Sequence, residues 1–586
     1  MGPADKPGVS SGESTLGETA SQPLGASAET DAEIAAGQAG EPRPSARETQ
    51  DHRRSAGIVG IAVLGSRMFG LVRELVFPAM FGAGKVLDAY LAAFQIPNLL
   101  RDLFAEGSLS TAFTALFTRI WDKEGDAPAW QLANLTISAM IFILGLVCIA
   151  AVIGAPLIVE VTNFGFHNVP GKFDLAVSLT RVMFPFILFV SLAAAVMGML
   201  NSRFIFGIPA SASTVFNIVS VIAGVACAFV FDAHARATWP HPEFGVASMY
   251  GVCVGVLLGG LAQLGMQLPS LFKLGFRFRW KLNLRDPRLI ELWTLMWPSV
   301  IAGSLTQVNV LVNGAFASEI NGGRTWLSCA FRLMYLPIGL FGVSLATVTL
   351  PAVARSYARQ QLGPFGKTVE SSLRLTLFLS IPAAIGLMVL ANPIIALIYQ
   401  HGRFTAHDTA MTALALQAYA IGLAGYAAIR LLTPCFYALN LPRTPMRIVM
   451  IGIGVNLVLN FLNMTVFHLG HAGLALAASC VCLANVSQLA FALSRQVNFG
   501  SLANWAGYLA RVLLASVLCG VAAFGLWWVT DTHVHGFVLR ALGLFVAIGA
   551  AVAVYAGAGY ALRIGETQEA VALFRRRLLR RRAAKA

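Results

Sequence analysis

The sequence predicts an all-α polytopic membrane protein with about 14 transmembrane helices. Its 586 residues are 57% hydrophobic and only 12% charged, whereas a soluble domain carries about 25% charged residues. The mean hydropathy is +0.70. The apolar runs reach the ~20 residues that a spanning helix needs, and the alternating pattern of outer-membrane barrel strands is absent from the sequence.

The chain begins with a polar segment and continues with the predicted spans. Residues 1–54 contain no Phe, Trp or Tyr and are rich in Ala, Gly, Ser, Pro and Glu. Such a composition cannot bury a core, so we expect a disordered cytoplasmic tail. The spans are expected at 56–82, 86–117, 132–160, 175–200, 208–231, 245–272, 289–316, 327–355, 371–399, 409–437, 445–468, 471–496, 508–530 and 537–563.

The distribution of Lys and Arg between the loops predicts the orientation. If the N-terminus is cytoplasmic, the inner segments carry seventeen basic residues and the outer loops only five, namely Lys85, Lys172, Arg236, Arg324 and Arg403. This bias and the basic C-terminal tail indicate that both ends lie in the cytoplasm. The formal net charge of +14 is therefore local and reports topology, with no indication of nucleic-acid binding.

A basic cytoplasmic linker at 273–288 divides the first twelve spans into six and six. We expect an N-terminal lobe at 55–272, a C-terminal lobe at 289–498, two further spans within 499–563, and a basic cytoplasmic tail at 564–586.

Charged residues are concentrated in the first two spans. They are Arg67, Arg73, Glu74, Asp88, Arg101, Asp102 and Glu106. A charge at the bilayer centre costs about 3 kcal/mol on insertion scales, so these side chains should face a bundle interior or a hydrated cavity. Internal ion pairing between two helices is one interpretation. The favoured one is a hydrated cavity with net positive sites for an anionic ligand.

Helical phase separates these charges. At about 100° per residue, one face of the second span carries Asp88, Gln95, Asp102 and Glu106. Arg101 points away from this stripe unless Pro97 breaks the helix. Arg332 and Arg430 lie in later spans without an acidic neighbour in their own helix, and they are expected to be further anion contacts.

Signs of catalysis or of a bound cofactor are absent from the sequence. It contains no GxxxxGK[ST] nucleotide loop and no Ser/His/Asp or HExxH pattern. The eight cysteines lie within predicted helices without a CxxC spacing, and we interpret them as small buried apolar residues. We therefore predict a protein that is not an enzyme and that has no cofactor and no metal site.

Residues 66–113 resemble the signature first two helices of the MurJ (MviN) lipid II flippases, which belong to the MOP exporter superfamily. They read SRMFGLVRELVFPAMFGAGKVLDAYLAAFQIPNLLRDLFAEGSLSTAF. Supporting matches are FRLMYLPIGLFGVSLATVTLPAVAR at 331–355, FTAHDTAMTALALQAYAIGLAG at 404–425 and FYALNLPRTPMRI at 436–448.

The resemblance implies two six-helix lobes around a central cavity, with the last two helices forming a groove for the lipid tail. It implies that undecaprenyl-diphosphate-linked peptidoglycan precursor, lipid II, moves from the cytoplasmic to the periplasmic leaflet of the bacterial inner membrane by alternating access. The implied substrate-binding residues are Arg67, Arg73, Arg101, Arg332 and Arg430. Glu74, Asp88, Asp102 and Glu106 are the acidic cavity or gating residues.

Membrane lipids are further expected partners, and Na+, H+ or the membrane potential is the expected driver. We expect a monomer, with cell-wall synthesis proteins as candidate associates. The chain departs from the family pattern at Gln95 and Asp102, where cations are usual, and at Phe331 and Tyr335, where acids are usual. Two alternatives stay open: an exporter of another lipid-linked glycan or of a cationic drug, and a membrane scaffold that transports nothing.

Overall fold

The structure is a computed structural model that describes residues 46–103, 109–534, 536–569 and 571–572. Its contacts divide the chain into two units, Met1–Ile58 and Val59–Ala586. The helices and sites below belong to the second unit, which α2 enters at Val59.

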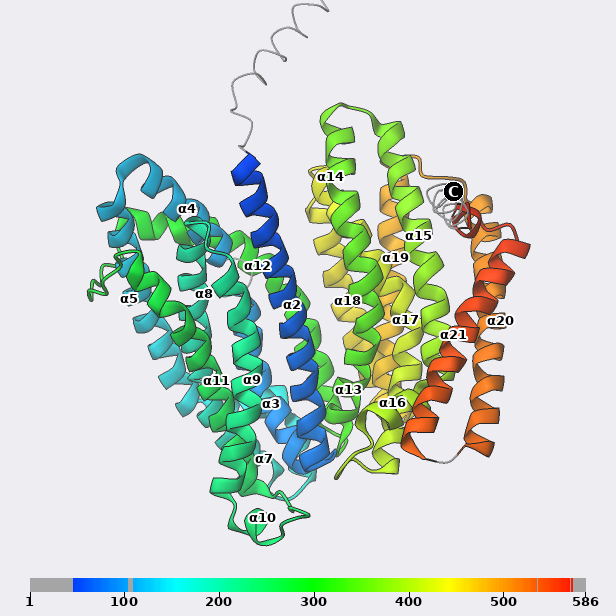
Figure 1. Cartoon of the computed structure of the whole chain (residues 1–586), viewed down its shortest axis with the longest axis horizontal. Helices are drawn as coiled ribbons and strands as arrows, with labels where there is room; N and C mark the ends of the chain where they lie inside the picture. Colours follow the sequence, from blue (N-terminus) through cyan, green and yellow to red (C-terminus); the bar gives the residue numbers. More distant parts are fainter. Residues whose placement is uncertain (1–45, 104–108, 535, 570, 573–586) are drawn as a thin grey trace, which may run out of the picture. The chain divides into compact units, whose positions relative to one another are not determined.

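The described residues form helices joined by turns and loops (Figure 1). Those of the first half are α2 (Ala46–Phe81), α3 (Lys85–Leu103), α4 (Leu109–Glu124), α5 (Asp126–Ile153), α6 (Ala155–Thr162), η2 (Phe164–Asn168), α7 (Lys172–Met183), α8 (Phe186–Ser202), α9 (Gly207–Phe231), α10 (Ala233–Ala237) and α11 (Val246–Lys273). Those of the second half are α12 (Pro287–Ala317), α13 (Gly323–Pro337), η3 (Ile338–Val343), α14 (Ser344–Ala358), α15 (Leu362–Val389), α16 (Ala391–Tyr399), α17 (Ala406–Ala438), α18 (Arg443–Leu462), η4 (Asn463–Phe467), α19 (Gly470–Ser494), α20 (Leu502–His533) and α21 (Phe537–Ala561).

The all-α membrane fold predicted from the sequence is confirmed. Among the described residues, 11 helices are long and apolar enough to cross a membrane, and each corresponds to a predicted span. The three other predicted spans correspond to α2, to α3 with α4, and to α12. Two predicted spans, 132–160 and 371–399, run past the ends of their helices, because α5 ends at Ile153 before Gly154 and α15 ends at Val389 before Leu390.

The hydrophobic cores fall into two groups along the chain. Three clusters are built from residues between Phe77 and Val300, and three from residues between Ala317 and Ile564. Helix α12 belongs to both groups. Its first half packs Leu292 and Met296 among α4, α5 and α8, and its last residue, Ala317, packs among α13, α16 and α17.

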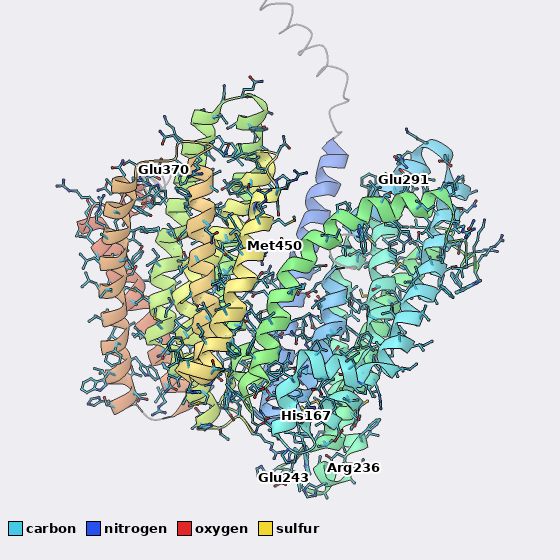
Figure 2. The ribbon with its side chains drawn as sticks, turned by 180° about the vertical axis from the view of Figure 1, so that it is seen from behind. His167, Arg236, Glu243, Glu291, Glu370 and Met450 are labelled. Carbon is cyan, nitrogen blue, oxygen red and sulfur yellow. The ribbon has the colours of Figure 1, made fainter. Side chains whose placement is uncertain are left out.

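Charged residues mark the two ends of the helical bundle. Figure 2 shows Glu291 and Glu370 toward one end and His167, Arg236 and Glu243 toward the other. We call the latter the α10 end. Helix α3 contacts both α7 and α13 toward this end (Figure 1).

Two details of side-chain placement bear on the sequence predictions. Cys482 is buried and Cys480 is exposed, so the expectation that all eight cysteines are buried was wrong for Cys480. Cys227 is only partly buried. The described residues hold no group of three or more His, Cys, Asp or Glu that could bind a metal ion.

Candidate functional site

A cluster of three charged side chains joins α2 to α13. Glu74 of α2 lies 3.7 Å from the Arg73 guanidinium and also forms an ion pair with Arg332 of α13. We call Arg73, Glu74 and Arg332 the central charge cluster. Arg73 and Glu74 are 12% and 16% exposed, but Arg332 is 41% exposed. One carboxylate therefore holds two guanidinium groups, and one of these remains accessible.

Aromatic rings surround Arg73. Its guanidinium carbon lies 5.7 Å from the ring centre of Phe94 and 5.3 Å from that of Phe216. These distances suit cation–π attraction. Its Nη1 is buried and has no hydrogen-bond partner among the described residues. Arg73 thus keeps one unused N–H donor, and the Glu74 carboxylate that it pairs with also holds the partly exposed Arg332.

Arg430 and Arg67 lie beside the segment that follows Arg332 along the chain, at the end of α13 and in η3. Arg430 of α17 donates from Nη2 to the Tyr335 hydroxyl at 3.0 Å, and its guanidinium lies 5.9 Å from that ring centre. Arg67 is exposed, and a Cβ built on Gly339 would lie 3.8 Å from its Nη1. Gly339 belongs to η3, a π-helix that directly follows Pro337. Such π-helical turns interrupt α-helices frequently at functional sites.

The polar stripe predicted for the second span is divided among separate partners. Arg101 donates to Asp102 at 2.9 Å and 3.2 Å, so the two residues expected to point apart are paired. Gln95 contacts α12 and α13. Asp88 lies apart from the central charge cluster, toward the α10 end. Glu106 lies outside the described residues.

Asp88 accepts four hydrogen bonds from two other helices and is fully buried. Lys172 of α7, also fully buried, donates to Oδ2 at 2.7 Å. The backbone N–H of Gly322 donates to Oδ2 at 2.7 Å, and Thr325 donates to Oδ1 from its N–H at 3.0 Å and its hydroxyl at 2.7 Å. The carboxylate thereby satisfies N–H groups at the start of α13 that the helix itself leaves free. We call Asp88, Lys172, Gly322 and Thr325 the closure contact.

A second group of contacts lies beside the closure contact. Asn168 of η2 donates to Glu319 at 2.7 Å, and the Gly165 N–H donates to the Ser318 hydroxyl at 3.0 Å. Ser318 and Glu319 follow directly after α12. The loop before α7 is therefore attached to the turn between α12 and α13.

The loop before α17 completes the contacts at this end. The backbone N–H of Arg403 donates to Ala79 at 2.8 Å, and its guanidinium donates to the Phe244 carbonyl at 2.5 Å. Gly82 has φ +67° and Gly402 has φ +58°, a region that favours glycine. A Cβ on Gly82 would lie 2.6 Å from the Arg403 carbonyl oxygen, so only glycine allows this approach.

Some polar residues of the interior were not selected from the sequence. Lys172 and Arg324 had been placed in outer loops, but both are buried. Asn456 of α18 donates to Asn309 and Asn313 of α12 at 2.7 Å, and Asn460 donates to Asn313 at 2.9 Å. The spacing of four residues between asparagines on both helices is a sequence signal for such a contact, since it places them on one helical face.

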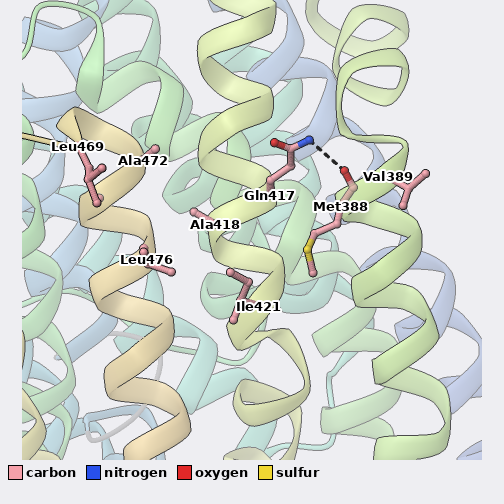
Figure 3. A pocket seen from close by; sticks show the side chains of 9 residues that line it. Met388, Val389, Gln417, Ala418, Ile421, Leu469, Ala472 and Leu476 are labelled. Carbon is pink, nitrogen blue, oxygen red and sulfur yellow. Dashed lines mark hydrogen bonds between the residues drawn. The ribbon is translucent and has the colours of Figure 1, made fainter. Parts of the chain in front are cut away.

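An apolar pocket of about 460 Å³ lies among α15, α17 and α19 (Figure 3). Its walls include Val389, Ile421 and Leu476. The amide of Gln417 also lines it and donates to the Met388 carbonyl at 3.1 Å. The pocket contains none of the charged residues described above.

Comparisons with known proteins agree on the family. A family model described as lipid II flippase MurJ matches residues 77–543. A probable lipid II flippase MurJ of Vibrio cholerae is 33% identical over 516 residues, which cover 86% of this chain and 94% of the relative.

Solved structures show the same fold. A lipid II flippase MurJ in an inward closed conformation has a TM-score of 0.70 at 24% identity, over 86% of this chain and 99% of that one. An inward-facing multidrug resistance MATE family transporter of the MOP superfamily has a TM-score of 0.60 at 12% identity, over 73% of this chain and 94% of that one.

Proposed function

The chain belongs to the MurJ family of lipid II flippases, and on this premise we propose that it moves lipid II from the cytoplasmic to the periplasmic leaflet of the bacterial inner membrane. The substrate is anchored by an undecaprenyl chain and carries a diphosphate between lipid and sugar. The chain acts as a transporter and performs no covalent chemistry.

The central charge cluster is the observation that carries this proposal. A diphosphate brings negative charge into an interior of low dielectric constant, where guanidinium forks suit phosphate oxygens. Glu74 holds Arg73 and Arg332 while no substrate is bound. The 41% exposure of Arg332 leaves it available for an incoming anion. Arg67, Arg101 and Arg430 extend the positive region along the path of the headgroup.

The closure contact gives the proposed transport cycle its outer gate. We assign the α10 end to the periplasm and both chain ends to the cytoplasm, as the loop charges predict. Asp88 then seals the periplasmic end while the cytoplasmic side admits substrate. Rocking of the two groups of helices opens the contact and exposes the bound headgroup to the other side. The protein works as a monomer in this cycle.

An electrical driving force suits an anionic headgroup. With an inside-negative membrane, outward movement of one negative charge is favoured by about 2.3 kcal/mol per 100 mV. Na+ or H+ coupling is the competing driver. The lipid tail stays in the bilayer and follows along α20 and α21, where Phe524 is 57% exposed and Phe545 is 66% exposed.

Complementation of a flippase-depleted bacterial strain tests the function. Wild type should restore growth and place lipid II in the outer leaflet, where an externally added probe detects it. Arg332→Gln and Arg73→Gln should each lose at least tenfold of the transport rate, since a hydrogen bond to a charged group contributes about 1.5–3 kcal/mol.

Arg236→Gln is the matched control, because among the described residues its guanidinium donates to the Phe229 and Val230 carbonyls at the α10 end. Deletion of residues 1–50 should also leave transport intact. A correctly inserted wild-type protein that leaves lipid II in the inner leaflet would rule out the flippase function. It would favour the scaffold or an exporter of another molecule.

A further inference from the structure

Arg324 is a buried arginine in the first turn of α13 that forms no close ion pair with a carboxylate of the described residues. It is 7% exposed. Its Nη2 donates to the side-chain oxygen of Gln95 on α3. Its Nη1 is buried and has no hydrogen-bond partner among the described residues.

Three helices form the surroundings of this guanidinium. Gln95 also donates from Nε2 to the Val310 carbonyl of α12 at 3.2 Å. A Cβ on Gly314 of α12 would lie 2.8 Å from the Arg324 Nη2 and 3.0 Å from the Gln95 Oε1. Glycine at 314 therefore leaves the space that the Arg324–Gln95 pair occupies. The neighbours identified by these contacts are neutral.

The other interior cations of this region differ in their partners. Arg73 and Arg332 share Glu74, and Lys172 has Asp88. The Asp88 carboxylate attracts the Arg324 charge from a distance, but its hydrogen bonds come from Lys172, Gly322 and Thr325. A buried charge whose hydrogen-bond partner is neutral is unfavourable unless an anion makes direct contact with it.

The position of Arg324 links it to the closure contact. Gly322 and Thr325, which donate to Asp88, flank Arg324 in the same turn of α13. A movement that separates the start of α13 from α3 must therefore break the Arg324–Gln95 hydrogen bond together with the closure contact.

We propose that Arg324 is a further substrate-positioning residue that binds a phosphate oxygen of the lipid-linked diphosphate when the closure contact opens. The Gln95 side-chain oxygen occupies the place of that phosphate oxygen in the closed state. This inference rests on the proposed flippase function. An ionised phosphate oxygen is the stronger acceptor, so it displaces the neutral amide. Arg324 thus takes up the anion at the stage when the path outward becomes accessible.

The substitution Gln95→Glu tests this role because it supplies a carboxylate of nearly the same shape to Arg324. The full-length protein is purified in detergent, and lipid II binding is measured by native mass spectrometry. Transport is measured in liposomes. We expect a higher melting temperature together with at least tenfold weaker lipid II binding and at least tenfold slower transport.

Two further substitutions separate charge from packing. Arg324→Gln should weaken lipid II binding by a similar factor, and Arg324→Lys, which keeps the charge but loses the planar fork, should give an intermediate affinity. Gln417→Glu adds the same negative charge at the distant apolar pocket and should leave binding and transport unchanged.

A merely structural role predicts a different result. If Gln95→Glu raises the melting temperature and leaves lipid II binding and transport as in wild type, the proposal is overturned, even if Arg324→Gln fails to fold. Wild-type protein that neither binds nor moves lipid II overturns the flippase function and this role together. If the wild type transports lipid II and the variants bind and transport it equally well, only the proposed role of Arg324 is overturned.

Discussion

Asp88 and Lys172 form an ion pair in which both side chains are fully buried. Asp88→Asn should lower the free energy of unfolding by about 3–5 kcal/mol, because it leaves the Lys172 charge buried without its partner. Thermal unfolding of the purified protein in detergent, together with denaturant titration, measures the loss.

The double variant Asp88→Asn with Lys172→Met provides the decisive comparison for this pair. It should lose less stability than the sum of the two single losses, because no unpaired charge remains. If the stability loss of the double variant equals the sum of the two single losses within about 0.5 kcal/mol, the two side chains act independently.

At the scale of single residues, the sequence located charged side chains within the helical bundle but did not predict their partners. Helical spacing and burial cost identified Glu74 and Arg332 as interior charges, because such groups are rare at membrane depth. The spacing could not show that they meet, since they lie on helices far apart in the chain. It also placed Lys172 and Arg324 in outer loops, because loop counting does not distinguish a solvated cation from one turned inward.

Among the helical elements, α10 and its neighbours are connected through one carboxylate. Asp232 caps α10 by accepting from the His234 and Ala235 N–H groups and also accepts from Gly245 and Ser248 at the start of α11. The Ser248 hydroxyl bond lowers the pKa of Asp232 below its usual value, helped by these backbone N–H groups and opposed by partial burial.

Asp232→Asn should therefore lower the free energy of unfolding by about 2 kcal/mol at pH 7. Because the folded pKa is depressed, this stabilisation is fully present above the unfolded value of about 3.9 and is lost as the pH falls through the folded pKa. The wild-type and variant unfolding curves should converge at low pH. The exposed Asp174→Asn is the control, and a difference that persists at pH 2 would contradict the assignment.

Element boundaries followed from the sequence only where a local signal exists. The eleven apolar helices match predicted spans because length and hydropathy are local properties. The role of α12 in both groups of hydrophobic cores depends on which helices meet it, and its composition carries no record of that. The π-helix after Pro337 was likewise invisible, since proline marks a break but does not specify its geometry.

For the whole molecule, alternating access requires the α10 end to open. A reducible bismaleimide should cross-link Asn168→Cys to Glu319→Cys, whose native side chains touch at 2.7 Å. The exposed Cys480 is changed to Ser to prevent side reactions. Cross-linking should stop lipid II transport in liposomes, and reduction should restore it.

Each single-cysteine variant treated with the same reagent serves as the control for chemical modification. Transport that continues in the fully cross-linked protein would show that the α10 end need not separate.

The family resemblance read from residues 66–113 is confirmed at the scale of the whole molecule. The state of the closure contact, in contrast, follows only from three-dimensional contacts.

The glycine contacts at the α10 end have a consequence for the membrane itself. Gly82 and Gly402 let two backbone segments touch without side chains between them, and the Arg403 N–H joins these segments by donating to the Ala79 carbonyl. We expect a join of this kind to exclude water between these two segments and so to limit leakage of protons and ions while the opposite side admits a bulky lipid headgroup. A bacterium depends on its membrane as an insulator for energy storage. By excluding water at this contact, the protein can support cell-wall growth without dissipating the membrane potential.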